Sequence, residues 1–133
     1  MTQKSMAVNI TREEFEKLIK EAIQQIPLKI RKLLDNVEIL VDDFPSEAQL
    51  NSVHKTNKMS LLGLYQGIPK TKRGVNYANV LPDRITLFQK PIEYTAQNKE
   101  DLKKIIKRVI IHELAHHFGF DETQARLLEK KKW

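Results

Sequence analysis

Residues 112–122 read His112-Glu113-Leu114-Ala115-His116-His117-Phe118-Gly119-Phe120-Asp121-Glu122, and the organisation of the chain can be argued outward from them. Residues four apart on a helix lie one above the other, so His112 and His116 can direct both imidazoles at one ion. Glu113 lies about 100° further round the helix axis, at the edge of the same face. This spacing predicts a metal site with a carboxylate beside the metal.

In zinc hydrolases with this spacing, such a carboxylate takes a proton from water activated by the metal. We therefore expect Zn2+ as the cofactor, His112 and His116 as metal ligands and Glu113 as the general base. Gly119 can end the helix with a left-handed residue, so that the chain turns back and offers a third ligand. Asp121 and Glu122 are the acidic residues at that place.

The helix upstream of the motif favours a metal site over a charged helix end whose histidines cap carbonyls. Its apolar residues recur at helical spacing, which predicts a buried stripe of Leu102, Ile105, Ile106 and Val109. Projected at about 100° per residue, His112, Glu113 and His116 fall on that stripe. Polar groups facing a core need partners, and a metal would satisfy them.

Composition is typical of a globular protein. The chain has 133 residues, 41% of them hydrophobic and 30% charged, and we expect one domain over 1–133 with a flexible basic tail at 129–133. No apolar run is long enough to span a bilayer, and no export signal stands at the start, so we expect a cytoplasmic protein without a membrane partner. Cysteine is absent, which excludes thiolate zinc sites. The net charge of +6 is spread along the chain and is weak evidence for a nucleic-acid partner.

The remaining segments predict an α+β fold, a compact small mixed sheet packed on helices with the His-Glu helix near the C-terminus. Thr11 and Glu14 form a capping box before a helix, and Asn98 caps a long helix from about Lys99 to Phe118. Pro91 is expected to end a strand, and Lys70 to Asn79 to form an exposed loop. The other predicted elements are short helices over 28–34 and from Ser46 to about Val53, and strands over 37–41, 61–65 and 84–88.

The motif and several upstream segments resemble the small bacterial zincin-like metallopeptidase family, whose signature is H-E-x-x-H-x-x-G-x-x-D. The similar segments include Leu62-Gly63-Leu64-Tyr65-Gln66-Gly67-Ile68-Pro69, Arg84-Ile85-Thr86-Leu87-Phe88 and His112 to Asp121. The resemblance implies a minimal zincin fold, with a small mixed sheet beside the active-site helix. It also implies a peptidase, although a defined substrate is generally lacking for that family.

Residue by residue, the resemblance makes His112 and His116 metal ligands, Glu113 the general base and Gly119 the turn. The family's aspartate ligand falls on Glu122, so Glu122 is favoured as the third ligand, with Asp121 as the alternative. His117 lies off the ligand face and is expected to be structural or to orient another group. A peptidase also needs a donor for the oxyanion, and Tyr65 and Tyr77 are the candidates.

Three functions compete. The leading one is a zinc peptidase, a monomer acting on a short peptide or an unfolded protein segment along an edge strand. The second is a metal-dependent RNA hydrolase, because the turn is also similar to the His-x-x-x-His-x-x-Gly-Tyr-Asp-His turn of an endoribonuclease family. That family has a third histidine where Glu122 stands, and it does not place a glutamate beside its first histidine. The third is a non-catalytic metal-binding or interaction module, which a closed four-ligand site would indicate.

Overall fold

Three strands form one mixed sheet in the computed structural model of this chain, which describes residues 8–67 and 82–119. The strands are β1 (Val37–Asp42), β2 (Gly63–Gln66) and β3 (Asp83–Phe88), in the order β1-β3-β2. β1 runs parallel to β3, and β2 runs antiparallel to it. The predicted α+β class with a small mixed sheet is confirmed, and β2 lies at one edge of the sheet as described.

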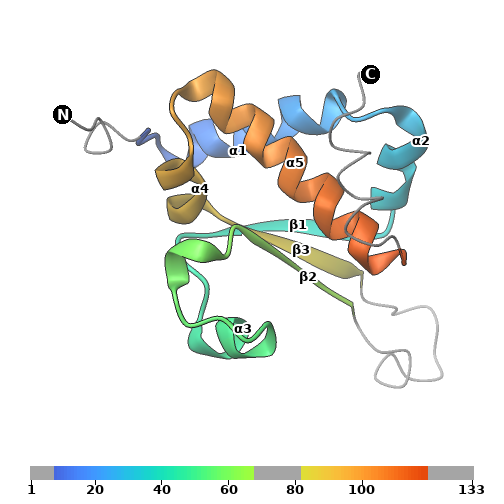
Figure 1. Cartoon of the computed structure of the whole chain (residues 1–133). Coiled ribbons are helices and arrows are strands. Elements are labelled where there is room, and N and C mark those ends of the chain that lie inside the picture. Colours follow the sequence, from blue (N-terminus) through green and yellow to red (C-terminus); the bar gives the residue numbers. More distant parts are fainter. Residues whose placement is uncertain (1–7, 68–81, 120–133) are drawn as a thin grey trace.

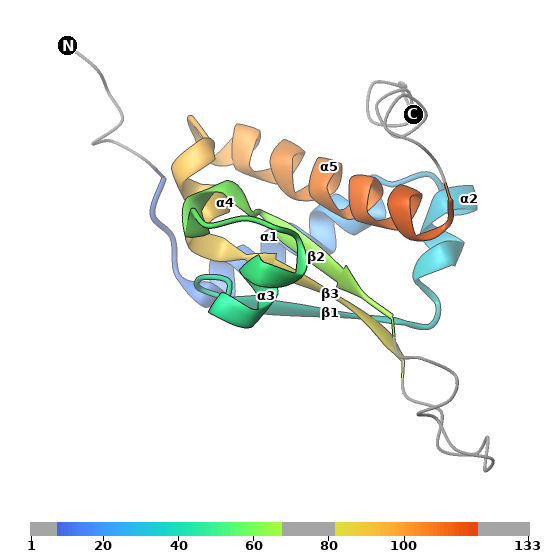
Figure 2. The same ribbon diagram turned by 60° about the horizontal axis from the view of Figure 1, so that its bottom comes forward.

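Helices cover both faces of the sheet (Figures 1 and 2). The long helices α1 (Arg12–Gln24) and α5 (Lys99–His117) lie over one face, and the short α3 (Glu47–Ser52) lies on the other. The shorter elements are α2 (Leu28–Arg31), η2 (Lys32–Leu34), η3 (Lys58–Ser60) and α4 (Gln89–Thr95). Among the residues described, no helix has the length and apolar character needed to cross a membrane.

Both long helices begin where the capping residues predict. The Thr11 side chain accepts a hydrogen bond from Glu14 N, and the Glu14 side chain accepts one from Thr11 N, which completes the capping box. The Asn98 side chain accepts from Asp101 N at the start of α5. Each contact satisfies a backbone N–H that has no partner within the helix. Local hydrogen bonds therefore fix where α5 begins. The helix then runs along the sheet, so its last turn, which contains the histidines, lies at the opposite end (Figure 1).

The main core lies between the sheet and the two long helices. Its fully buried members include Phe15 from α1, Ile85 and Leu87 from β3, and Ile106 and Ile110 from α5. The predicted stripe on α5 is confirmed, because Leu102, Ile105, Ile106 and Val109 are all buried. A second, smaller cluster fills the space between α3 and the opposite face of the sheet, and it consists of Leu50, Leu61, Leu64 and Phe88.

Two sequence predictions need correction. The strand expected over 61–65 begins two residues later, at Gly63, because η3 occupies the preceding residues and Leu61 follows it. Pro91 does not simply end a strand. It lies in the first turn of α4, where proline is tolerated because its missing N–H would have no partner in the helix. The predicted loop over 70–79 and the basic tail over 129–133 lie outside the described residues.

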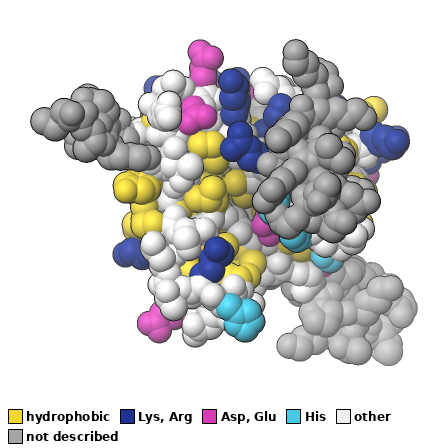
Figure 3. All heavy atoms as spheres, viewed as in Figure 1, with side chains coloured by type: hydrophobic (Ala, Val, Ile, Leu, Met, Phe, Trp, Pro, Cys, Tyr) yellow, Lys and Arg dark blue, Asp and Glu magenta, His cyan; other side chains and the backbone are white. Residues whose placement is uncertain are grey.

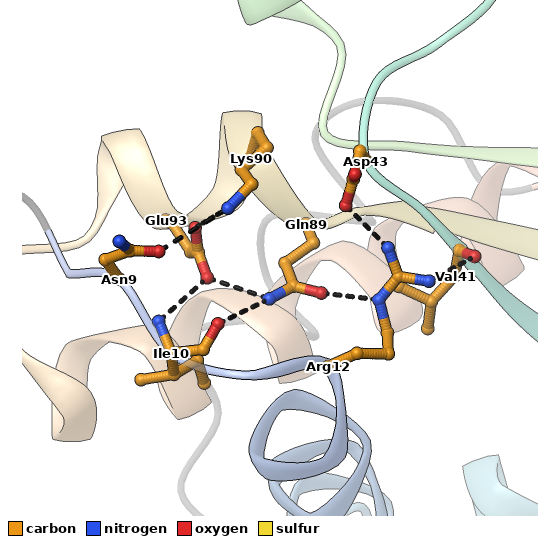
Figure 4. Close-up of polar contacts among 8 residues, drawn as sticks. All are labelled: Asn9, Ile10, Arg12, Val41, Asp43, Gln89, Lys90 and Glu93. Carbon is orange, nitrogen blue, oxygen red and sulfur yellow. Dashed lines mark hydrogen bonds and ion pairs between the residues drawn. The ribbon is translucent and has the colours of Figure 1, made fainter.

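A buried polar network ties the start of the chain to α4 and β1 (Figure 4). The Gln89 amide donates to Ile10 O at 3.1 Å and to Glu93 Oε2 at 2.9 Å, and its oxygen accepts from Arg12 Nε at 2.7 Å. Arg12 also donates to Val41 O at 3.3 Å. Gln89 is 2% exposed, so these contacts satisfy a side-chain amide that water does not reach. The network fixes the entry of α1 against the end of β1.

Candidate metal centre

The predicted ligands His112 and His116 lie next to each other near the C-terminal end of α5. Their ring centroids are 4.5 Å apart and the ring planes are tilted by 45°. His112 is half-buried and His116 is exposed, so the expectation that both face the core is wrong for His116. The core stripe gives way to a surface at the last turn of the helix, and Figure 3 shows histidine side chains reaching the surface there beside an acidic one.

Gly119 leaves the helix as predicted. Its φ is +88°, in the left-handed region, and its N–H donates to His116 O at 3.2 Å. The helical conformation therefore ends at Gly119. The predicted third ligand, Glu122 or Asp121, lies outside the described residues, as does the candidate oxyanion donor Tyr77. Within residues 8–67 and 82–119, no three histidine or acidic side chains gather closely enough to hold a metal.

Glu113 is held by the sheet. Its Oε1 accepts a hydrogen bond from the backbone N–H of Tyr65 at 2.9 Å, across 48 residues of sequence. Burial raises the pKa of the Glu113 carboxyl above its ordinary value, and the Tyr65 hydrogen bond and the nearby His112 and His116 oppose that rise. A carboxyl whose pKa is raised by burial is suited to exchange protons nearer neutral pH.

The antiparallel ladder explains why the Tyr65 N–H is available to Glu113. Phe88 N donates to Leu62 O at 2.9 Å, and hydrogen-bonded pairs recur at every second residue of an antiparallel pair. The pairing of Leu64 with Thr86 is therefore hydrogen-bonded, and that of Tyr65 with Ile85 is not. The Tyr65 peptide group consequently faces away from β3, at the edge of the sheet, where Glu113 meets it.

Helix α5 packs closely against strand β2 on both sides of the contact between Tyr65 and Glu113. A β-carbon built on Gly63 would lie 2.5 Å from Val109 Cγ1, and one built on Gly67 would lie 3.3 Å from His117 Cε1. Four helical residues rise about 6 Å, and two strand residues span about 6.6 Å. These spacings nearly match, so successive turns of the helix meet every second residue of the strand. Val109 lies against Gly63, Glu113 against Tyr65, and His117 against Gly67. The two glycines let the helix approach closely enough for Glu113 to reach Tyr65.

Tyr65 is also held by its side chain. Its ring stacks on His117, with centroids 3.9 Å apart and planes 15° from parallel. Its hydroxyl donates to Asp83 Oδ2 at 2.9 Å, and His117 Nε2 lies 3.6 Å from the same oxygen. His117 contacts both Tyr65 and Asp83 here, and its expected structural or orienting role stays a prediction. In this structure the Tyr65 hydroxyl proton is directed at Asp83, and its suggested role as an oxyanion donor stays a prediction.

Sequence reasoning missed Asp83, Gly63 and Gly67. Asp83 directly follows Pro82, and an aspartate there is most simply a turn residue before the strand expected over 84–88. The glycines carried a usable signal, because Gly63 and Gly67 flank Tyr65 at two residues on either side and so face the same side of a strand. Small residues on one face of an edge strand indicate close approach by another element.

The described residues include ligand types that zinc binds. Two imidazoles one helical turn apart offer nitrogen donors, a ligand type that zinc accepts readily. Glu113 accepts a hydrogen bond from Tyr65 N and lies close to the two histidines. Its carboxylate is therefore placed beside the nitrogen donors. Oxygen ligation by an acidic residue after Gly119 would complete a three-ligand catalytic set.

A helix with the His-Glu-x-x-His sequence over the edge strand of a small mixed sheet defines a zincin-type α+β protein. The sequence profile of the zincin-like metallopeptidase family matches residues 34–133, and the chain belongs to that family. The predicted resemblance is thereby confirmed. Among solved structures, a conserved hypothetical protein from Thermo thermophilus is similar in fold, with a TM-score of 0.53 and 21% identity. The match covers 81% of this chain and 94% of that one. No curated protein matches the chain.

Proposed function

We propose that this protein is a zinc-dependent peptidase in which His112 and His116 hold the metal and Glu113 is the general base. Family membership supports a metallopeptidase. The observation that carries the assignment of roles is the hydrogen bond from Tyr65 N to Glu113 Oε1, which fixes the carboxylate beside the two imidazoles. When bound, zinc would supply a Lewis acid that lowers the pKa of water and polarises a carbonyl.

The residues of this chain divide the remaining work. Glu113 uses one oxygen to accept from Tyr65 N, so proton transfer falls to the other oxygen of the carboxylate. Its raised pKa favours taking a proton from water and returning it to the leaving amine. Glu122 is the proposed third ligand, with Asp121 as the alternative, and the other is free to orient a histidine.

The proposed substrate is a short peptide or an unfolded protein segment. β2 forms an edge of the described sheet and carries Tyr65, so an extended peptide laid along this edge would pass next to Glu113. Extended segments bind such edges through main-chain hydrogen bonds, and here these would use groups of β2 other than Tyr65 N, because Glu113 accepts from that N–H. This mode requires a substrate that is already unfolded at the cleaved bond.

The test is Glu113→Gln in the full chain, purified without an affinity tag, loaded with zinc and assayed on a broad mixture of peptides. The variant keeps the size and the hydrogen-bond acceptor but cannot take a proton, so we expect zinc to stay bound and cleavage to fall about 100-fold to 10,000-fold. Glu100→Gln is the matched control, because Glu100 is an exposed acid in the first turn of the same helix. Cleavage that survives in Glu113→Gln contradicts the assigned role.

A further inference from the structure

Asp83 is linked to the Glu113 carboxylate through a single residue, Tyr65. Asp83 is the first residue of β3, and its Oδ2 accepts from the Tyr65 hydroxyl at 2.9 Å. The backbone N–H of the same tyrosine donates to Glu113 Oε1 at 2.9 Å. One side of Tyr65 therefore binds the centre strand of the sheet, and the other binds the proposed general base on α5.

The ladder with β3 holds β2 through Leu64 and Gln66, the neighbours of Tyr65, and it does not itself set the position of the Tyr65 ring. The strand spans only Gly63–Gln66, and the Tyr65 peptide group faces away from the ladder with β3. Stacking on His117 sets the plane of the ring but allows it to slide, because stacked rings tolerate lateral offsets. A directional hydrogen bond from the hydroxyl to Asp83 sets where along that plane the ring stops.

We propose that Asp83 is a positioning residue for the general base. It holds the Tyr65 ring in place, and the ring in turn keeps the Tyr65 N–H against Glu113 Oε1. The catalytic consequence rests on the proposed function of Glu113, whereas the positional claim concerns contacts within the protein alone. Loss of the Asp83 contact should therefore loosen the Tyr65 amide whether or not the chain cleaves peptides.

Two features of Asp83 have to be separated, its hydrogen-bond acceptor and its charge. The carboxylate lies 3.6 Å from His117 Nε2, so it also forms an ion pair whenever that imidazole is protonated. Asp83→Asn keeps an oxygen that can accept from the Tyr65 hydroxyl and removes the charge. Asp83→Ala removes both, and Tyr65→Phe removes the hydroxyl while leaving the ring to stack. Positioning by the hydrogen bond predicts that Asn resembles the wild type and that Ala resembles Tyr65→Phe.

The primary experiment is amide hydrogen exchange by NMR on the full chain without metal. The readout is the exchange rate of the Tyr65 amide relative to that of Ile106, which lies in the fully buried part of α5 and reports global opening. We expect the relative rate to rise about fivefold to tenfold in Asp83→Ala and in Tyr65→Phe, the loss expected for one hydrogen bond. It should stay near the wild-type value in Asp83→Asn.

Asp43→Ala is the matched control. Asp43 is also an aspartate at a strand end, and it pairs with Arg12 away from β2. Its removal should leave the relative exchange rate of Tyr65 unchanged. An unchanged Tyr65 rate in Asp83→Ala, or an equal rise in Asp43→Ala, overturns the proposal.

A kinetic arm connects the contact to catalysis. In zinc-loaded protein, Asp83→Ala should lower kcat about tenfold with KM nearly unchanged, because a misplaced base slows the chemical step and leaves binding intact. The same substitution should have little further effect in a Glu113→Gln background, since both changes act on one group. If the wild-type chain cleaves no peptide, the proposed function fails while the exchange experiment still decides the role of Asp83. Additive losses in the double variant overturn the link to Glu113.

Discussion

Gly63 lies directly beneath Val109, so closely that a β-carbon on Gly63 would come within 2.5 Å of Val109 Cγ1 and 3.3 Å of Thr86 O. Val109 is one helical turn before Glu113, and Gly63 is two residues before Tyr65. The approach of α5 to β2 at this point is therefore what allows the next turn of the helix to place Glu113 against Tyr65 N.

Gly63→Ala should separate the helix from the strand. Val109 is β-branched and has few rotamers in a helix, so it cannot easily move aside. We expect a loss of about 1–3 kcal/mol in the free energy of unfolding, as for other overpacked sites. The Tyr65 amide should also exchange faster, because the Glu113 contact lengthens. Urea denaturation and NMR exchange measure the two effects.

The control for this clash is the double variant Gly63→Ala with Val109→Ala. Val109→Ala alone should cost about 2 kcal/mol by removing buried methyl groups. In the double variant the added methyl group occupies part of the space that Val109 leaves, so the total loss should be smaller than the sum of the single losses. Strict additivity would show that the Gly63–Val109 contact does not set the spacing.

Gln89 should be intolerant of apolar replacement. Its side chain makes three hydrogen bonds, with Ile10, Arg12 and Glu93, and it is 2% exposed. Gln89→Leu keeps a similar volume but leaves buried groups unpaired, which costs about 1–3 kcal/mol for each group. We expect the free energy of unfolding to fall by at least that amount, with zinc affinity unchanged because the network lies away from the histidines. A stability equal to that of the wild type would contradict the account.

The raised pKa of Glu113 gives the metal-free protein a specific pH dependence. Burial raises this pKa, so the folded state binds the proton more readily than the unfolded chain does. The stability contributed by the protonated group is present below the unfolded pKa and is lost as pH rises through the raised folded pKa. The advantage of Glu113→Gln over the wild type in free energy of unfolding should therefore grow as pH rises through this window.

Urea denaturation of both proteins with a chelator present, from about pH 4 to about pH 8, measures this difference. Other ionisable groups are common to the two proteins, so the change in the difference with pH isolates Glu113. A difference that does not change with pH would show that burial leaves the Glu113 proton equilibrium as it is in the unfolded chain.

The local parts of the structure could be predicted from sequence, and the contacts that build the site could not. The capping box at Thr11 and the cap at Asn98 fixed the starts of α1 and α5, because their signals lie within four residues. The helical spacing of His112 and His116 placed both rings together for the same reason. The Tyr65–Glu113 hydrogen bond joins residues 48 apart and has no local signature.

Two predictions were wrong because the same local pattern is compatible with two structures. Pro91 suits a strand end and the first turn of a helix, and the structure has the second in α4. His116 follows the buried stripe by periodicity but is exposed, because the stripe ends at the surface in the last turn of α5. Helical spacing predicts which residues share a face of the helix, but it does not predict how far along the helix the sheet covers that face.

Zinc binding by isothermal calorimetry tests the central claim most directly, using the full chain purified without an affinity tag. We expect one zinc per chain, an affinity reduced roughly 100-fold or more in His116→Ala, and an affinity retained in Glu113→Gln. His54→Ala is the control, since His54 is exposed in the turn after α3 and should not alter the affinity. A wild-type chain that binds no zinc, or a His116→Ala variant that binds it equally well, would contradict the account.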